Sequence, residues 1–141
     1  MAETHKKEIT SMMQLEQYIA GWRAHDVTAI LATLVPDCVV IESFGPIYRG
    51  HDCVAQWVST WLADDGCVID WTIRDLRTSA EGETAEWAFH YRWRGEEMRF
   101  DGATIATLRD GKLSYLREYA TTAALYDWRG EWQQTFATTV S

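Results

Sequence analysis

Apolar residues recur at helical spacing over the first third of the chain. In residues 11–22 they fall every three or four positions, which predicts a helix with one apolar stripe. Asp26 interrupts the pattern and is a suitable N-cap for a second helix. The second stripe continues to a Pro-Asp pair at residues 36–37, and we expect the helix to end there.

A short strand and a third helix are expected next. Residues 38–42, Cys-Val-Val-Ile-Glu, form a β-branched run that ends in a carboxylate. After a turn at residues 45–46, residues 49–50 lead into a third helix, with Asp52 as its candidate cap. The apolar face of this helix includes two tryptophans that lie one turn apart.

The rest of the chain alternates between apolar and polar residues, which is typical of strands. Strands are predicted over residues 67–78, 84–94 and 98–108, and from residue 112 to about 121. Helices followed by a run of antiparallel strands indicate an α+β fold. We expect a cone-shaped roll in which about three N-terminal helices pack on a strongly curved, mostly antiparallel sheet and enclose a pocket. The many bulky rings favour a cone over flat packing.

The turn between the second and third of these strands decides how their residues pair. A two-residue turn at residues 95–96 would place Trp87 opposite Thr104. The same turn would set His90 opposite Asp101 on the outer face. The inner face then carries four aromatic side chains: Trp87, Phe89, Tyr91 and Phe100.

Length and composition describe one globular domain. The 141 residues are 47% hydrophobic and 24% charged, which is too apolar for a disordered chain. The net charge of −8 repels phosphate backbones, so we expect no nucleic-acid partner. No apolar run approaches the roughly 20 residues of a membrane span, and the polar N-terminus lacks the apolar core of a signal peptide. We therefore expect a cytoplasmic protein.

Residue types with catalytic or metal-binding potential narrow the chemistry. The three cysteines, an odd number without C-x-x-C spacing, are predicted to be buried, reduced thiols. The four histidines lack the spacing of metal ligands, and the sequence has no glycine-rich phosphate loop or nucleophile elbow. We therefore expect neither a metal nor a cofactor. Tryptophan is abundant, at eight residues, and rings in this number suit a flat, apolar ligand.

Several segments form a recognisable set when taken together. They are Tyr18, Trp22, His25-Asp26, the run from Pro36 to Glu42, Tyr48-Arg49-Gly50, residues 108–113 and Glu118-Tyr119. This set resembles the nuclear transport factor 2-like superfamily, and within it the SnoaL-like and ketosteroid isomerase-like branch. The resemblance covers residues 10–122. We expect residues 1–9 to be a flexible tail and residues 123–141 to be a C-terminal extension that is packed on the domain or partly loose.

The resemblance implies a pocket between the helices and the inner face of the sheet. It puts Tyr18 at the oxyanion-stabilising tyrosine of the isomerases and Glu42 at the position of their aspartate base. The second oxyanion donor of those isomerases is a protonated aspartate. This chain has Thr104 at that position, and a threonine hydroxyl is a weaker acid.

The turn before the last strand decides whether a second carboxylate reaches the pocket. A two-residue turn would point Tyr115, Arg117 and Tyr119 into the pocket. A three-residue loop at residues 109–111 would instead turn Leu116 and Glu118 inward, and the resemblance favours this loop. Glu118 would then share the cavity with Glu42, as a pair of carboxylates that can hold a proton.

Each candidate residue also has a purely structural explanation. Glu42 is either a buried base with a raised pKa or a structural residue at a strand end. In the second case its carboxylate is exposed or accepts hydrogen bonds from backbone N–H groups. Glu118 is either its partner or one half of an ion pair with an arginine. Tyr18 is either an oxyanion donor or a core tyrosine with a partnered hydroxyl. The candidate substrate-binding residues, which core packing would also explain, are Trp22, Trp57, Trp61, Trp87, Phe89, Tyr91, Phe100, Thr104 and Leu116.

Two function classes stay open. One is a cofactor-independent isomerase, cyclase, dehydratase or hydrolase that uses a carboxylate base on a small, largely apolar molecule. The other is a non-catalytic dimeric module that binds a small-molecule ligand or serves in assembly. We expect a two-fold homodimer through the outer sheet face, which is too apolar for a fully wet surface. Its apolar residues are Ala88, Ala103, Ile105, Leu113, Tyr115 and Tyr119.

Overall fold

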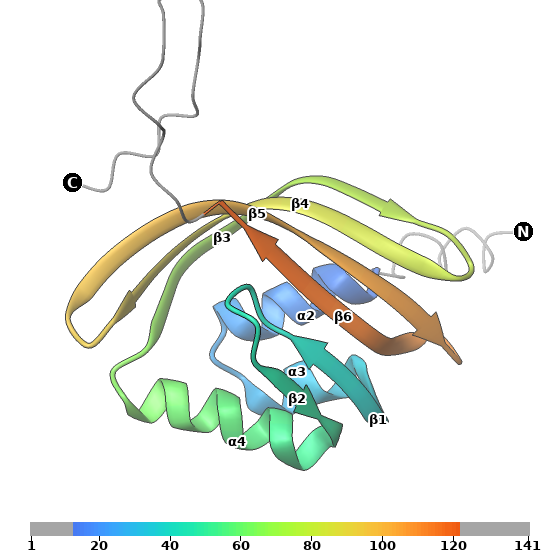
Figure 1. The fold of residues 1–141 in the computed structure, drawn as a ribbon, viewed down its shortest axis with the longest axis horizontal. Helices are drawn as coiled ribbons and strands as arrows, with labels where there is room; N and C mark the ends of the chain where they lie inside the picture. Colours follow the sequence, from blue (N-terminus) through green and yellow to red (C-terminus); the bar gives the residue numbers. More distant parts are fainter. Residues whose placement is uncertain (1–12, 122–141) are drawn as a thin grey trace, which may run out of the picture.

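Three helices pack against the concave side of a six-stranded sheet in the part of the chain that the structure describes (Figure 1). The computed structural model describes residues 13–121, so the expected tail and C-terminal extension lie outside it. The helices are α2 (Gln14–Arg23), α3 (Val27–Ala32) and α4 (Gly50–Ala63). The strands are β1 (Leu34–Ile41), β2 (Ile47–Arg49), β3 (Cys67–Thr78), β4 (Gly82–Trp93), β5 (Glu96–Arg109) and β6 (Lys112–Ala120).

The strands follow the order β2-β1-β6-β5-β4-β3 across the sheet. Neighbouring strands are antiparallel except β1 and β6, which run parallel. In Figure 1 the long strands β3, β4 and β5 arch over α2, whereas α4 lies near β1 and β2. This arrangement confirms the expected α+β roll of helices on a strongly curved, mostly antiparallel sheet.

Two of the helices begin at positions that their own sequence sets. Asp26 caps α3 as predicted, since its Oδ1 accepts from the backbone N–H of Ala29 at 3.0 Å. The predicted cap of α4 is wrong: Arg49 occupies the N-cap position, and Asp52 lies inside the first turn. The helix starts instead at Gly50, whose φ of 80° is accessible to glycine without strain.

The first helix, α2, is capped from the sheet. Glu83 on β4 is 4% exposed and accepts from the backbone N–H groups of Leu15, at 2.8 Å, and Gln14, at 3.2 Å. A carboxylate there satisfies two free donors and faces the positive end of the helix dipole. The contact fixes α2 against the sheet, and with it the side chains of Tyr18 and Trp22.

The second helix is shorter than predicted, and the first strand is longer. α3 ends at Ala32 and β1 begins at Leu34, so Pro36 lies in a strand rather than at a helix end. The pairing of β1 with β6 is interrupted between Leu34 and Val39, where the missing N–H of proline costs no ladder hydrogen bond. β2 was not predicted, because three residues are too few to show alternation.

The hairpin between β4 and β5 turns one residue earlier than predicted. Residues 94–95 form the turn, and their φ values of 51° and 80° are typical of a type I′ turn. The predicted pairs are therefore wrong by two positions, and Trp87 lies opposite Gly102 rather than Thr104. A shift of two keeps every side chain on its face, so the predicted inner rings do pack inward.

The last hairpin reaches the expected faces by a different route. Its turn has two residues, 110–111, rather than three. Ser114 then bulges out of the register between β5 and β6. Beyond the bulge, Leu116 and Glu118 lie on the inner face, as expected. Leu113, before the bulge, is fully buried, so its predicted place on the outer face is wrong.

The core lies between the helices and the sheet, and one glycine makes room for a tryptophan in it. The most deeply buried aliphatic residues are Leu15, Ile19, Ile30, Leu34, Val40, Val54, Val58, Leu113 and Leu116. A Cβ at Gly102 would lie 2.5 Å from the Trp87 ring and 2.4 Å from the backbone oxygen of Tyr119. Gly102 therefore lets the Trp87 indole lie directly against β5.

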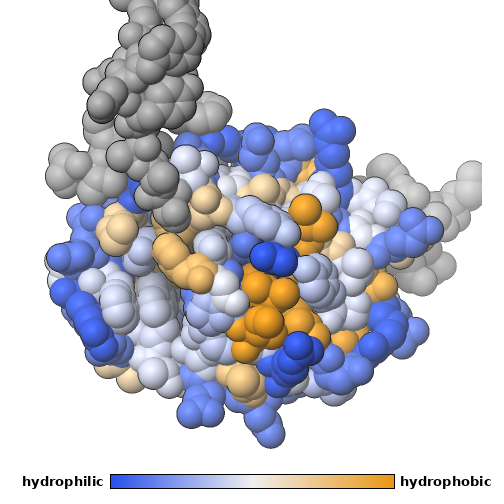
Figure 2. Space-filling model, viewed as in Figure 1, coloured by the Kyte–Doolittle hydropathy of each residue, from blue (hydrophilic) through white to orange (hydrophobic). Residues whose placement is uncertain are grey.

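In Figure 2 hydrophilic residues surround the edge of the face, and residues of intermediate hydropathy occupy much of its centre. An apolar patch lies over β1 and β2, where Ile47 on the edge strand is 49% exposed. None of the described helices has the length and apolar character needed to cross a membrane.

The three cysteines are free, and they differ in burial. Cys38 is buried and Cys67 is partly buried, whereas Cys53 is exposed. The prediction of three buried thiols is therefore wrong for Cys53. This residue lies on α4 next to the buried Val54, and neighbouring positions on a helix point in different directions.

Candidate functional site

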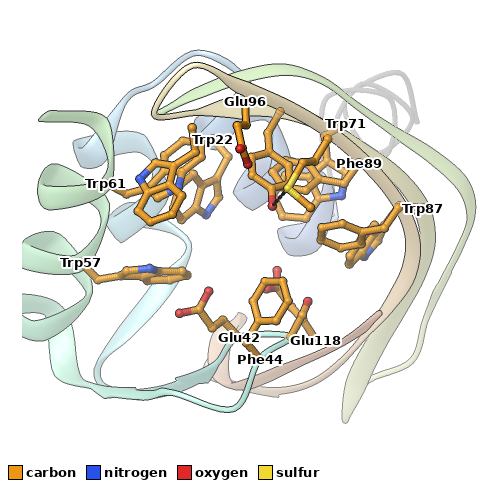
Figure 3. A pocket seen from close by; sticks show the side chains of 15 residues that line it. Trp22, Glu42, Phe44, Trp57, Trp61, Trp71, Trp87, Phe89, Glu96 and Glu118 are labelled. Carbon is orange, nitrogen blue, oxygen red and sulfur yellow. Dashed lines mark hydrogen bonds between the residues drawn. The ribbon is translucent and has the colours of Figure 1, made fainter. Parts of the chain in front are cut away.

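A cavity of about 500 Å³ lies between the helices and the inner face of the sheet (Figure 3). A space of this size suits a small molecule. All six tryptophans within residues 13–121 line it, and three carboxylates join them. The lining residues are Trp22, Glu42, Ser43, Phe44, Trp57, Trp61, Trp71, Trp87, Phe89, Tyr91, Trp93, Glu96, Met98, Phe100 and Glu118.

The aromatic rings around the cavity pack against one another. The Trp22 indole meets those of Trp57 and Trp61 edge to face, with centroids 5.0 and 5.7 Å apart. On the sheet, Phe89 stacks on Tyr91 with centroids 4.9 Å apart. Contacts of this kind stabilise the fold beyond the burial of apolar surface, and they hold each ring in one orientation. These contacts therefore fix the shape of the cavity wall.

Glu42 follows β1 directly and is held by a tyrosine that was not among the predicted site residues. The Tyr48 hydroxyl donates to its Oε1 at 2.5 Å, since the β1–β2 hairpin brings the two side chains together. Burial raises the pKa of Glu42, and the hydrogen bond from Tyr48 opposes part of this rise. Tyr48 also stacks on Trp57, with ring centroids 4.2 Å apart. Tyr48 therefore contacts both the Glu42 carboxylate and the aromatic wall of the cavity.

Glu118 reaches the cavity from β6, and Figure 3 shows it on the same side as Glu42. Burial, and then the charge of Glu42, raise the pKa of Glu118 to about 8. Near neutral pH Glu118 therefore keeps its proton, next to a second carboxyl group whose pKa is also raised. Such a pair can accept a proton at one group and donate a proton from the other.

The predicted site residues divide into those on the cavity surface and those behind it. The rings on the surface are Trp22, Trp57, Trp61, Trp87, Phe89, Tyr91 and Phe100. Tyr18, Thr104 and Leu116 are buried and are not among the described residues that line the cavity. Burial, and then the charge of Glu118, raise the pKa of Tyr18 well above its usual value, so its hydroxyl stays protonated. Thr104 accepts from the Trp87 Nε1–H at 2.8 Å and so orients that ring.

Part of the lining was not predicted: Ser43, Phe44, Trp71, Trp93, Glu96 and Met98. Phe44 and Met98 are 62% and 44% exposed, so they form the rim of the cavity rather than its interior. Trp71 lies opposite Phe89 on the neighbouring strand, and its indole meets that ring with centroids 4.8 Å apart. Trp71 could have been predicted from the sequence, because it is the cross-strand partner of Phe89, a predicted inner ring.

The predicted partner of His90 is wrong. Its ring contacts Glu97, because the shifted register places Asp101 opposite Ala88 instead. Asp101 forms an ion pair with Arg74 at 2.7 Å. Within residues 13–121, no group of three or more His, Cys, Asp and Glu side chains is placed to hold a metal ion.

Comparisons with known proteins agree with this fold. Residues 15–116 match the family of the SnoaL-like domain. A putative polyketide cyclase from Xanthomonas campestris is 18% identical, with a TM-score of 0.63 over 75% of this chain and 86% of that one. A protein with a ketosteroid isomerase-like fold from Catenulispora acidiphila, solved in complex with trimethylamine, is 16% identical, with a TM-score of 0.66 over 78% and 86%.

A third solved structure is an LEH-like epoxide hydrolase from M. tuberculosis, which is 15% identical, with a TM-score of 0.68 over 77% of this chain and 80% of that one. At sequence identities this low, the similarity to each of these structures shows a shared fold. No curated protein matches the sequence.

Proposed function

Since the chain belongs to the SnoaL-like family of the nuclear transport factor 2-like superfamily, we propose that it is a cofactor-independent acid/base enzyme acting on a small, largely apolar molecule. One observation carries the proposal: Glu42 and Glu118 share one side of an aromatic cavity, and burial raises the pKa of both. Perturbed carboxyl groups in a cavity are typical of acid/base sites. The structural neighbours named as a polyketide cyclase and an epoxide hydrolase support this broad class.

Glu42 is the proposed base. Its raised pKa makes it a stronger base than an exposed glutamate, and the Tyr48 hydroxyl holds its carboxylate in place. Glu118, which is protonated near neutral pH, is the proposed acid and returns a proton to the substrate. Isomerase, cyclase, dehydratase and hydrolase chemistry all need this exchange of one proton.

Tyr18 and Thr104 support the site from behind the cavity wall. For Tyr18 we propose an electrostatic role, because its hydroxyl stays protonated and interacts with the charges of Glu118 and Glu42. From behind the wall, the dipole of this hydroxyl would stabilise negative charge that forms beside the carboxyl pair. Thr104 is proposed to position the Trp87 ring, to which it is hydrogen bonded.

The test replaces the carboxylates with amides of the same shape. Glu42→Gln should lower the turnover of an enolisable ketone or an epoxide by about 100-fold or more. Glu118→Gln should lower turnover as well and remove a titration from the pH profile near pH 8. Glu86→Gln removes the same charge from an exposed site on β4 and should leave turnover unchanged. Wild-type turnover in Glu42→Gln would reject the proposed base.

A second candidate function, ligand binding without catalysis, is favoured by the extent of the aromatic lining. Six tryptophans around one cavity can hold an apolar ligand without any proton transfer. Ligand binding, followed by tryptophan quenching, separates the two functions when it is combined with turnover assays. Quenching without turnover of any ketone or epoxide would support the binding module.

We also propose a two-fold homodimer through the outer sheet face. Ile105 on β5 and Tyr119 on β6 are 50% and 47% exposed there, and Tyr119 lies opposite Ala103. Exposed apolar residues that gather on one sheet face are typical of an interface. Ile105→Lys should convert a dimer to a monomer in light scattering at tens of micromolar. A wild-type monomer under the same conditions would refute the proposal.

A further inference from the structure

The cavity wall carries negative charge without a compensating positive group. Three of its described lining residues are glutamates, Glu42, Glu96 and Glu118, and none of them is lysine, arginine or histidine. Most of the other lining groups are aromatic rings, whose faces carry negative electrostatic potential. Both features favour a positively charged ligand and disfavour an anion.

The arginine at the rim does not supply the missing charge. Arg94 lies over the Trp93 ring, with its guanidinium carbon 4.3 Å from the ring centroid. Its Nε donates to the Asp64 Oδ2 at 2.6 Å, and its side chain is 63% exposed. The charge of Arg94 is therefore paired at the surface. Its contact with Trp93 also shows that a ring of this cavity accepts a cation on its face.

We infer that the cavity takes a small organic cation, an apolar amine or quaternary ammonium ion whose charged nitrogen lies beside Glu42 and Glu118. This inference rests on the proposed function and names the class of its substrate. Figure 3 shows the two carboxylates on one side of the cavity, with Trp22 and Trp71 across the space from them. The apolar part of the ligand would pack against those indoles.

A bound cation would relieve the cost of placing two carboxylates in one apolar space. Ionised carboxylates among aromatic rings lose their hydration and repel each other. This cost keeps a proton on Glu118 near neutral pH. A positive charge beside the pair offsets both effects, so Glu118 should release its proton when the cation binds. A neutral ligand leaves the pair unchanged, and an anion adds to the repulsion.

The groups that face this pair determine the pH range of the effect. Glu42 follows β1, Tyr48 lies on β2 and Tyr18 lies on α2, and each has an electrostatic interaction with Glu118. Cys38 on β1 interacts in turn with Tyr18. All of these groups are acids. Cation binding should therefore release up to about one proton at pH 7 and become tighter as the pH rises through about 8.

The test compares two ligands of the same shape. Benzyltrimethylammonium carries a fixed positive charge, and neopentylbenzene is its neutral carbon isostere. Each is titrated into the full chain, with tryptophan fluorescence and calorimetry as readouts. At pH 8.5 the cation should bind about tenfold tighter or more, in line with a desolvated contact between a cation, rings and carboxylates. Calorimetry in two buffers of different ionisation enthalpy should show proton release at pH 7 for the cation alone.

Variants locate the selectivity in the cavity. Glu42→Gln combined with Glu118→Gln should reduce the preference for the cation to about threefold or less, while the isostere binds as before. Glu86→Gln removes a charge on the outside of β4 and should keep the full preference, which separates the site from the net charge of the protein.

The outcomes separate this inference from the proposed function. If the wild type binds both ligands equally, or the isostere more tightly, the cation inference is overturned and an apolar pocket remains. If neither ligand binds, the inference and the pocket function are both overturned. The measurement does not depend on turnover, so a failure of the enzyme proposal leaves a measured cation preference intact.

Discussion

Replacing Glu83 with alanine should loosen α2 from the sheet. The buried carboxylate accepts from the Leu15 and Gln14 backbone N–H groups at 2.8 and 3.2 Å, and from the Thr78 hydroxyl at 3.3 Å. A hydrogen bond to a charged group contributes about 1.5–3 kcal/mol, and its loss leaves buried donors without acceptors. Relief from burying a carboxylate offsets part of the loss. We therefore expect the free energy of unfolding to fall by about 2–4 kcal/mol.

Urea unfolding, followed by tryptophan fluorescence, measures this change. With a denaturant slope of about 1.5 kcal/mol per molar, a loss of about 3 kcal/mol lowers the midpoint by about 2 M. Glu83→Gln keeps one acceptor oxygen and should fall between the wild type and alanine. Glu86→Ala, three positions along the same strand but exposed, should change stability by less than about 0.5 kcal/mol. Equal midpoints for Glu83→Ala and Glu86→Ala would refute the long-range cap.

Three further changes test the cavity. The folded wild type keeps a proton on Glu118 up to about pH 8, whereas the unfolded chain loses it near pH 4.5. The free energy of unfolding of the wild type should therefore fall by up to about 1.4 kcal/mol per pH unit between these values, and Glu118→Gln should remove this fall. Urea midpoints at pH 5 and 8 check this, and parallel losses in both proteins would contradict it. Gly102→Ala should cost about 2 kcal/mol in thermal unfolding, because its Cβ would meet the Trp87 ring at 2.5 Å; an unchanged melting temperature would contradict the close contact. Tyr48→Phe should raise the pKa of Glu42 further in a carboxyl NMR titration, because it removes the hydrogen bond that lowers this pKa.

The inner face of the sheet was predictable from alternation, but the pairing of its strands was not. Trp87 and Phe89 are on the predicted face because an error of two positions leaves the face unchanged. The turn was misplaced because Gly95 can serve as either central residue of a hairpin turn. The chain uses it as the second, after Arg94 with a positive φ.

The contacts that complete the site join segments whose pairing no local pattern marks. Glu83 is an ordinary polar residue of a strand in the sequence, yet it caps a helix 68 positions away. Glu118 reaches the cavity through a bulge at Ser114, so its orientation was correct by family resemblance and not by turn geometry. Tyr48 had a local signal, since a Gly-Pro turn separates it from Glu42, but its strand is too short for alternation to show.

The pKa of Glu118 is the quantity on which the carboxyl pair depends most directly. Glutamate labelled with carbon-13 at the side-chain carboxyl allows each group to be titrated by NMR, and the missing signal in Glu118→Gln assigns the resonance. We predict a titration midpoint near pH 8 for Glu118 in the ligand-free protein. A midpoint near 4.5, the ordinary value of an exposed glutamate, would contradict a proton shared in the aromatic cavity.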